Sequence, residues 1–164
     1  MAKYIPYTKY DAQMKYFKMS DFIRSQTAAK FKIENLPEDW QMDNAFELYK
    51  EILHPLCEEW EKYCHLMGLP KPWSIKINSG IRSEILNRII NGNDNSPHFN
   101  GYAVDLYPNN HQIKHFKQFC ITFLNDKSYD QIISEYENKN GIPSWIHISY
   151  KSHNGKQRKE VLTT

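Results

Sequence analysis

The sequence predicts one α+β domain in which helices pack on a mainly antiparallel sheet of at least four strands. Apolar residues recur at helical spacing in residues 43–67 and 113–124, and they alternate with polar residues in several shorter segments. A chain of 164 residues suits a single domain with a substantial core. Its hydrophobic content of 40%, with 14% aromatic residues, is typical of a folded protein.

The amino-terminal half is expected to be mostly helical. Residues 1–15 lack periodicity and are interpreted as an extended arm. Ser20 can cap a short helix. A long helix follows from Asp43 to Met67, with a kink expected at Pro55 and its end set by Gly68. The domain itself is predicted to span residues 16–150.

Strands dominate the expected carboxyl-terminal half. Alternation predicts strands at 73–78, 102–107, 129–136 and 145–150. Between them lie a helix from Ser83 to about Ile90 and another over 113–124. Residues 151–164 are basic and are interpreted as a solvated tail, because short charge runs are weak binding signals.

The stretch from Ser96 to Leu106 carries the strongest chemical signal. His98 and Asp105 can share one zinc ion only if the chain folds back between them, because zinc ligands lie ~2 Å from the metal. Asn100-Gly101 suits such a reversal. On the strand that follows, Ala103 and Asp105 share a face, and the small Ala103 leaves space there.

A third ligand is predicted on the last strand. In residues 145–150, His147 lies on the face opposite to Ile146 and Ile148. If this strand neighbours the Asp105 strand, both side chains converge on one point. Two histidines, one carboxylate and an open fourth position characterise a catalytic zinc site, so we predict one zinc ion at His98, Asp105 and His147.

These residues resemble the zinc D-Ala-D-Ala carboxypeptidases and endopeptidases of peptidase family M15. The likeness rests on Ser96-x-His98-x-x-Gly101-x-Ala103-x-Asp105, on the Trp-x-His ending at His147, and on an upstream Ser79-Gly-Ile-Arg-Ser83 with Asn87. Residues 17–28 resemble the lead-in of a branch common in bacteriophage genomes. The resemblance implies the zinc fold shared by these peptidases and the Hedgehog signalling domain.

A general base is harder to place. Much of the family has Glu or Asp three residues before the last histidine, where this chain has Ser144. The branch resembled by the amino terminus instead carries a Glu at the end of the preceding strand, which matches Glu135. We therefore predict Glu135 as general base and acid, with Glu137 and Asp130 as reserves.

The resemblance also assigns substrate contacts. Arg82 offers a planar, permanently charged fork for a peptide carboxylate or an oxyanion. The alternative for Arg82 is a surface ion pair with Glu84 or Asp94. Ser96 either binds substrate or shapes the loop. Trp145 and Tyr102 are expected to support packing, not to contact substrate.

Three cysteines do not suggest a disulfide framework. Cys57 and Cys64, near His54 and His65, could form a second metal cluster, but their helical surroundings favour a core position. A net charge of +2 does not indicate nucleic-acid binding. No apolar run approaches a membrane span, and the amino terminus lacks a secretion signal.

The resemblance implies a peptidase acting on peptidoglycan stem peptides, of D,D-carboxypeptidase or endopeptidase type. A phage endolysin fits best: a monomer made in the cytoplasm that acts on the cell wall after release. Phage-particle components and bacterial remodelling enzymes stay as alternatives, as does cleavage of the L-Ala–D-Glu bond. Because Ser144 replaces an acid, a non-catalytic zinc-binding module is a further alternative.

Overall fold

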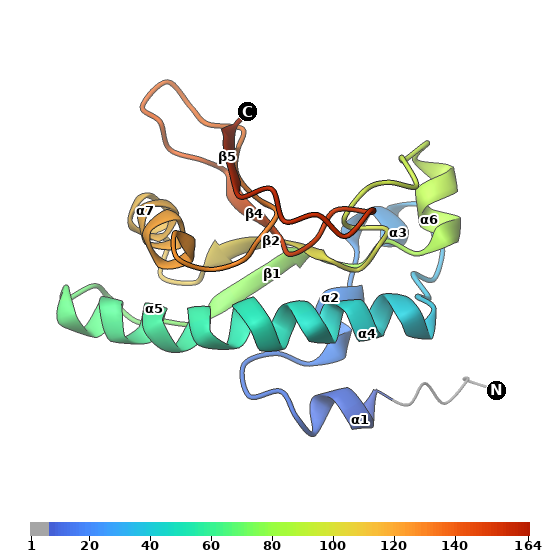
Figure 1. The fold of residues 1–164 in the computed structure, drawn as a ribbon, viewed down its shortest axis with the longest axis horizontal. Coiled ribbons are helices and arrows are strands. Elements are labelled where there is room, and N and C mark those ends of the chain that lie inside the picture. Colours follow the sequence, from blue (N-terminus) through green and yellow to red (C-terminus); the bar gives the residue numbers. More distant parts are fainter. Residues whose placement is uncertain (1–6) are drawn as a thin grey trace.

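A computed structural model describes residues 7–164 as helices packed around one five-stranded sheet (Figure 1). The strands are β1 (Ile75–Ser79), β2 (Ala103–Pro108), β3 (Gln131–Glu135), β4 (Trp145–Ser149) and β5 (Glu160–Thr163). Their order is β1-β2-β4-β3-β5. Neighbouring strands are antiparallel except for the parallel pair β3 and β5. The predicted α+β class is confirmed.

The helices cover the sheet and close the core. They are α1 (Thr8–Asp11), α2 (Met19–Ile23), α3 (Gln26–Lys30), α4 (Asp39–Leu48), α5 (His54–Leu66), α6 (Glu84–Ile89) and α7 (Ile113–Leu124). Val104 and Ile148 of the central strands are fully buried. The rings of Trp60 on α5 and Phe116 on α7 pack edge-to-face at 5.1 Å, which joins the two longest core helices.

A single rod contains α4, a π-helical turn over Tyr49–Leu53 and α5 (Figure 1). The helix begins at Asp39, four residues before the predicted start. In place of the expected kink, a wider turn precedes Pro55, and the backbone N–H of His54 bonds to the carbonyl of Tyr49, five residues back. Proline lacks an amide proton, so a wider turn accommodates it without breaking the rod.

The described part of the amino-terminal segment is not an extended arm. Residues 8–11 form helix α1, and Tyr10 is buried. The hydroxyl of Tyr10 donates to Asp43 at 2.6 Å, and the backbone N–H of Lys15 donates to the hydroxyl of Tyr49 at 2.8 Å. These bonds tie the segment to the long rod. Residues 1–6 of the expected arm lie outside the described part of the chain.

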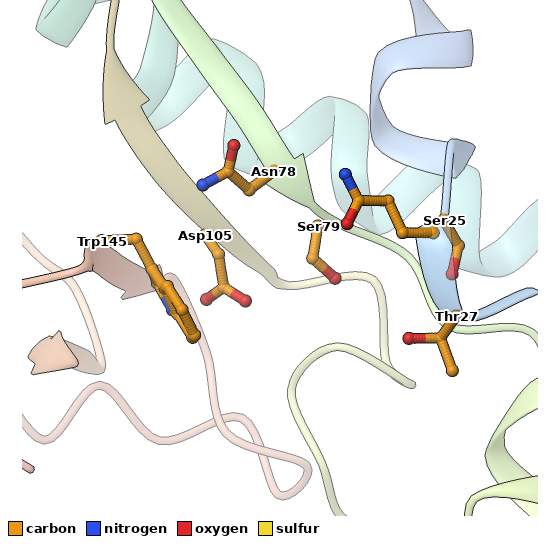
Figure 2. A pocket seen from close by; sticks show the side chains of 7 residues that line it. Ser25, Thr27, Asn78, Ser79, Asp105 and Trp145 are labelled. Atoms are coloured by element: carbon orange, nitrogen blue, oxygen red, sulfur yellow. The ribbon is translucent and has the colours of Figure 1, made fainter. Parts of the chain in front are cut away.

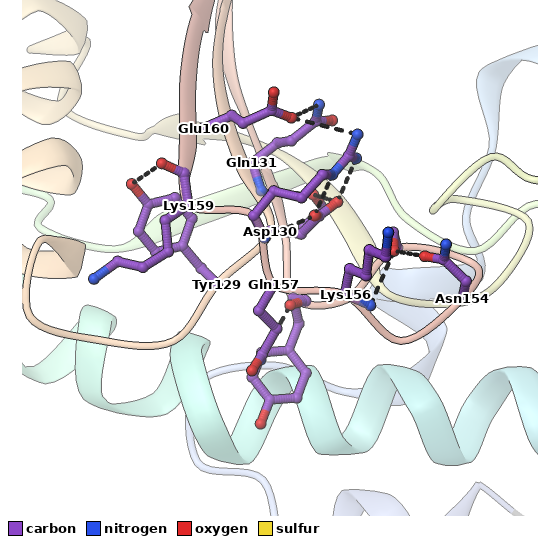
Figure 3. A network of polar contacts seen from close by, with 12 residues as sticks. Tyr129, Asp130, Gln131, Asn154, Lys156, Gln157, Lys159 and Glu160 are labelled. Atoms are coloured by element: carbon purple, nitrogen blue, oxygen red, sulfur yellow. Dashed lines mark hydrogen bonds and ion pairs between the residues drawn. The ribbon is translucent and has the colours of Figure 1, made fainter.

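The carboxyl-terminal segment also differs from the expected solvated tail. β5 extends the sheet by pairing with β3. Arg158 makes a two-point ion pair with Asp130, which is fully buried. Figure 3 shows Asp130 at the centre of a polar network that includes Gln131 and Glu160. A short charge run carries no sign of a buried partner 28 residues away, so the sequence alone suggested a tail.

Cys57, Cys64 and Cys120 are free and buried, as their helical spacing predicts. Burial raises the pKa of the Cys57 and Cys120 thiols, so both remain protonated. Within residues 7–164, one group of side chains lies close enough together to hold a metal ion, and it contains none of these cysteines. None of the described helices is both long and apolar enough to cross a bilayer.

Candidate active site

The three predicted metal ligands come together on the open face of the sheet. Asp105 on β2 is directly opposite His147 on β4, so both side chains lie on one face. Oδ1 of Asp105 lies 3.0 Å from Nδ1 of His147 and 3.4 Å from Nε2 of His98. Ligand atoms ~2 Å from one zinc ion lie at about these separations.

His98 reaches the site through the predicted reversal. Gly101 has φ +81°, in the left-handed region that favours glycine. A Cβ at this position would lie 2.3 Å from the carbonyl oxygen of Gln41. Gln41 is itself buried, and its amide donates to the carbonyls of Arg82 and Phe99 at 3.0 and 2.7 Å. Helix α4 therefore holds both loops that border the site.

A backbone carbonyl orients the His98 ring. Nδ1 of His98 lies 2.8 Å from the carbonyl oxygen of Gly80, which only accepts hydrogen bonds. Nδ1 must therefore carry a proton, which leaves Nε2, the nitrogen that faces Asp105, as the atom of His98 available to a metal ion. Gly80 approaches α2 so closely that a Cβ would lie 2.5 Å from the carbonyl oxygen of Phe22. Gly80 in the Ser79-Gly80 turn thus allows close packing against α2 and also orients the His98 ring.

The donor set fits zinc on its own chemistry. His98 and His147 are 9% and 5% exposed, and Nε2 of His147 is buried without a partner among the described residues. Burial alone would raise the pKa of the Asp105 carboxyl, but hydrogen bonds with His147 and His98 outweigh burial and hold this pKa well below its usual range. An ionised carboxylate beside two imidazoles is a ligand set that zinc accepts.

Arg82 lies near this cluster instead of pairing on the surface. Its Nη1 donates to Oδ1 of Asn87 at 3.2 Å, while Glu84 pairs with Arg88. Asp94 accepts from the amide of Asn87, not from Arg82. Burial lowers the pKa of the Arg82 guanidinium, and the charge of Asp105 partly offsets this effect. The guanidinium remains charged because arginine is not deprotonated in proteins.

Glu135 ends β3 on the same face as the ligands. Ile133 is opposite His147 and Glu135 is opposite Trp145, so Glu135 is the diagonal neighbour of His147 across the strand pair. Diagonal neighbours in an antiparallel pair lie about 7–8 Å apart, a separation that leaves space for a substrate or water. Oε2 of Glu135 accepts a hydrogen bond from the hydroxyl of Thr164 at 2.8 Å.

The two reserve carboxylates are engaged elsewhere. Asp130 is buried under Arg158, and Glu137 pairs with Lys117 and accepts from the Ser134 hydroxyl. Hydrogen bonds from Lys117 and Ser134 lower the pKa of Glu137. Neither group is a free base, which leaves Glu135 as the better candidate.

Ser144 and Ser96 both form hydrogen bonds with neighbouring parts of the chain. Ser144 is exposed, and its hydroxyl donates to the carbonyl of Tyr136 at 3.3 Å. The carbonyl of Ser96 accepts from the backbone and side-chain amides of Asn100 at 3.0 and 2.9 Å. These bonds shape the loop through the backbone of Ser96 and not through its hydroxyl.

A pocket of about 370 Å³ opens beside Asp105 (Figure 2). Trp145 and Asp105 form one side in the figure, and Ser25 and Thr27 form the other. Gln26, Asn78 and Ser79 complete the lining. Trp145 therefore borders the pocket, whereas the sequence suggested only a packing role. The contribution of Ser25–Thr27 was missed, although they fall within the recognised lead-in of residues 17–28.

Comparison with known families agrees with this geometry. A model of the family described as peptidase M15 matches residues 15–149. The chain belongs to the peptidase M15 family. Members of this family are zinc-dependent metallopeptidases, which identifies the chain as a metallopeptidase by family. Among curated proteins, none matches the chain closely enough to count as a relative.

Proposed function

We propose that this M15 protein is a zinc peptidase that hydrolyses peptide bonds in peptidoglycan stem peptides, of D,D-carboxypeptidase or endopeptidase type. His98, Asp105 and His147 would hold one zinc ion. When bound, zinc supplies Lewis-acid chemistry by polarising a carbonyl and lowering the pKa of water. The observation that carries the proposal is the convergence of these three donors beside an open pocket.

Glu135 would take the proton from the attacking water and return it to the leaving amine. The carboxylate stands on the ligand face, one residue pair along the sheet from His147. A carboxylate can act as this proton shuttle only when it is free of ion pairs, and both Asp130 and Glu137 are paired. General acid–base catalysis of this kind contributes typically 10²–10⁴-fold in rate.

Arg82 would bind the substrate close to the ligand Asp105. Its half-buried guanidinium presents several N–H donors near Asp105. A peptide carboxylate or the developing oxyanion would accept these donors, because charge-assisted bonds are about twice as strong as neutral ones. Asn87 fixes the orientation of Arg82 through one Nη1 bond. The hydroxyl and amide groups of the pocket would pair with the peptide backbone.

The biological setting proposed is lysis of a host cell wall by a phage endolysin. The support is the likeness of residues 17–28 to a branch common in bacteriophage genomes, together with Ser25–Thr27 lining the pocket. A virion component or a bacterial enzyme would use the same chemistry.

The test is mass spectrometry of fragments released from purified peptidoglycan by the zinc-loaded protein. Glu135→Ala should release none, while Glu34→Ala, which removes an exposed carboxylate away from the ligands, should behave as the wild type. New termini identify the bond cleaved, including the L-Ala–D-Glu alternative. A zinc-loaded wild type that releases nothing would refute the peptidase and favour a zinc-binding module of the same fold. Release by Glu135→Ala would move the base elsewhere.

A further inference from the structure

Thr164 follows β5 at the edge of the sheet and forms four hydrogen bonds with residues 134–137 at the end of β3. Its N–H donates to the carbonyl of Ser134 at 2.9 Å, and its carbonyl accepts from the N–H of Glu137 at 3.0 Å. Its hydroxyl accepts from the N–H of Tyr136 at 3.1 Å and donates to Oε2 of Glu135 at 2.8 Å. The backbone of this turn and the carboxylate of Glu135 thus both bind Thr164.

The backbone at Tyr136 is arranged for this contact. Tyr136 has φ +50°, which is uncommon for a residue with a Cβ. The conformation turns two successive N–H groups, those of Tyr136 and Glu137, toward Thr164. Because the hydroxyl oxygen already accepts the Tyr136 N–H, the remaining O–H is directed at Glu135.

We propose that Thr164 is a positioning residue that holds the Glu135 carboxylate in the orientation needed for proton transfer. The proposal rests on the function assigned to Glu135 above. A free glutamate side chain populates several rotamers, and one hydrogen bond to Oε2 selects among them while leaving Oε1 for the substrate water. Thr164 acts through Glu135 and touches no reacting atom.

This contact lies outside the part of the chain that matches the family model, which ends at residue 149. It is brought to the site by β5, whose Thr163 pairs with Ser134 on β3. The segment that contains β5 thus supplies a hydrogen bond to the proposed base, Glu135.

The experiment compares three variants of the full-length, zinc-loaded protein on a soluble stem pentapeptide that contains both L-Ala–D-Glu and D-Ala–D-Ala bonds. Thr164→Val removes the hydroxyl and keeps a β-branched side chain. Thr164→Ser keeps the hydroxyl. Thr163→Val is the matched control, because it removes a hydroxyl from the adjacent exposed strand residue.

Thr164→Val should lower kcat about five- to tenfold with KM changed less than about twofold, since a hydrogen bond to a charged group is lost at an exposed position. Thr164→Ser should restore kcat to within about twofold of the wild type, and Thr163→Val should match the wild type. All variants should keep one zinc per chain and remain folded at the assay temperature.

An unchanged kcat in Thr164→Val would overturn the inference, and so would equal losses in the Val and Ser variants. Inactivity of the wild type on both this peptide and purified peptidoglycan would instead refute the proposed peptidase. The contact itself is tested without activity by NMR of the Glu135 side-chain carboxyl carbon. Its chemical shift should change in Thr164→Val and not in Thr163→Val, and equal shifts in both would also overturn the inference.

Discussion

Replacing Gly101 by alanine should disrupt the site more than the same change at another left-handed glycine. Gly101 and Gly141 have similar φ values, +81° and +72°. An added Cβ at Gly141 would meet no atom within 4 Å, whereas at Gly101 it would lie 2.3 Å from the carbonyl oxygen of Gln41. The pair of variants therefore separates backbone strain from a steric clash.

The expected costs follow from these contacts. A left-handed alanine costs about 1–2 kcal/mol, offset by about 0.4–1 kcal/mol because alanine also restricts the unfolded chain. Gly141→Ala should thus lower the free energy of unfolding by about 1 kcal/mol. Overpacking adds about 1–3 kcal/mol, so Gly101→Ala should lose about 2–4 kcal/mol in total. For a chain of 164 residues, each 1 kcal/mol lowers Tm by about 3 °C.

The assay is thermal unfolding in zinc-free buffer, followed by circular dichroism, with zinc affinity then measured by competition with a chromophoric chelator. The N–H of Gly101 donates to the carbonyl of His98 at 3.2 Å, so a displaced turn also displaces this ligand. Gly101→Ala should weaken zinc binding, and Gly141→Ala should not. Equal Tm decreases and equal zinc affinities in both variants would show that the close approach to Gln41 does not constrain the loop.

Three further predictions test the rest of the molecule. Arg158→Ala should lower the free energy of unfolding at pH 7 by about 2 kcal/mol, since it leaves the buried Asp130 carboxylate without its partly exposed cation. Burial alone would raise the pKa of Asp130, but Arg158 holds this pKa below its usual range. The difference in unfolding free energy between the variant and the wild type should therefore shrink as pH falls below about 4. Urea denaturation from pH 3 to 7 measures this difference. Chelation of zinc should lower the calorimetric Tm, and His147→Ala should abolish this response; an unchanged wild-type Tm would contradict a zinc site. Arg82→Lys should lower kcat/KM at least about tenfold with zinc content unchanged, because an ammonium cannot replace a planar fork, and wild-type kinetics would exclude Arg82 from substrate binding.

The sequence predicted elements whose signal is local. Ile75 and Ile77 alternate on β1, and Ser83 caps α6 through a bond to the N–H of Leu86. The convergence of the three proposed metal ligands was also predictable, because a reversal at Gly101 and strict alternation on β2 and β4 fix the faces of their side chains. Whether β2 and β4 were neighbours was an assumption until the sheet order was known.

Features that depend on distant partners were not predictable. β5 is four residues long, with Val161 and Leu162 adjacent and exposed, so it shows no alternation, and its partner β3 lies far upstream. Ile132 and Ile133 likewise blur the alternation of β3. The placement of Glu135 on the ligand face follows from its register with Trp145, which only the sheet reveals.

The π-helical turn over Tyr49–Leu53 determines where the long helix can lose a residue. Such a turn holds one residue more than an α-helical turn, so the rod carries a surplus residue at this place. Deleting one residue there and replacing Pro55 by alanine would allow ordinary α-helical bonding to resume, and Gln41 on one side and Trp60 on the other would keep their faces. A deletion elsewhere in the rod would rotate one half by about 100° and carry Gln41 away from the loop that contains His98.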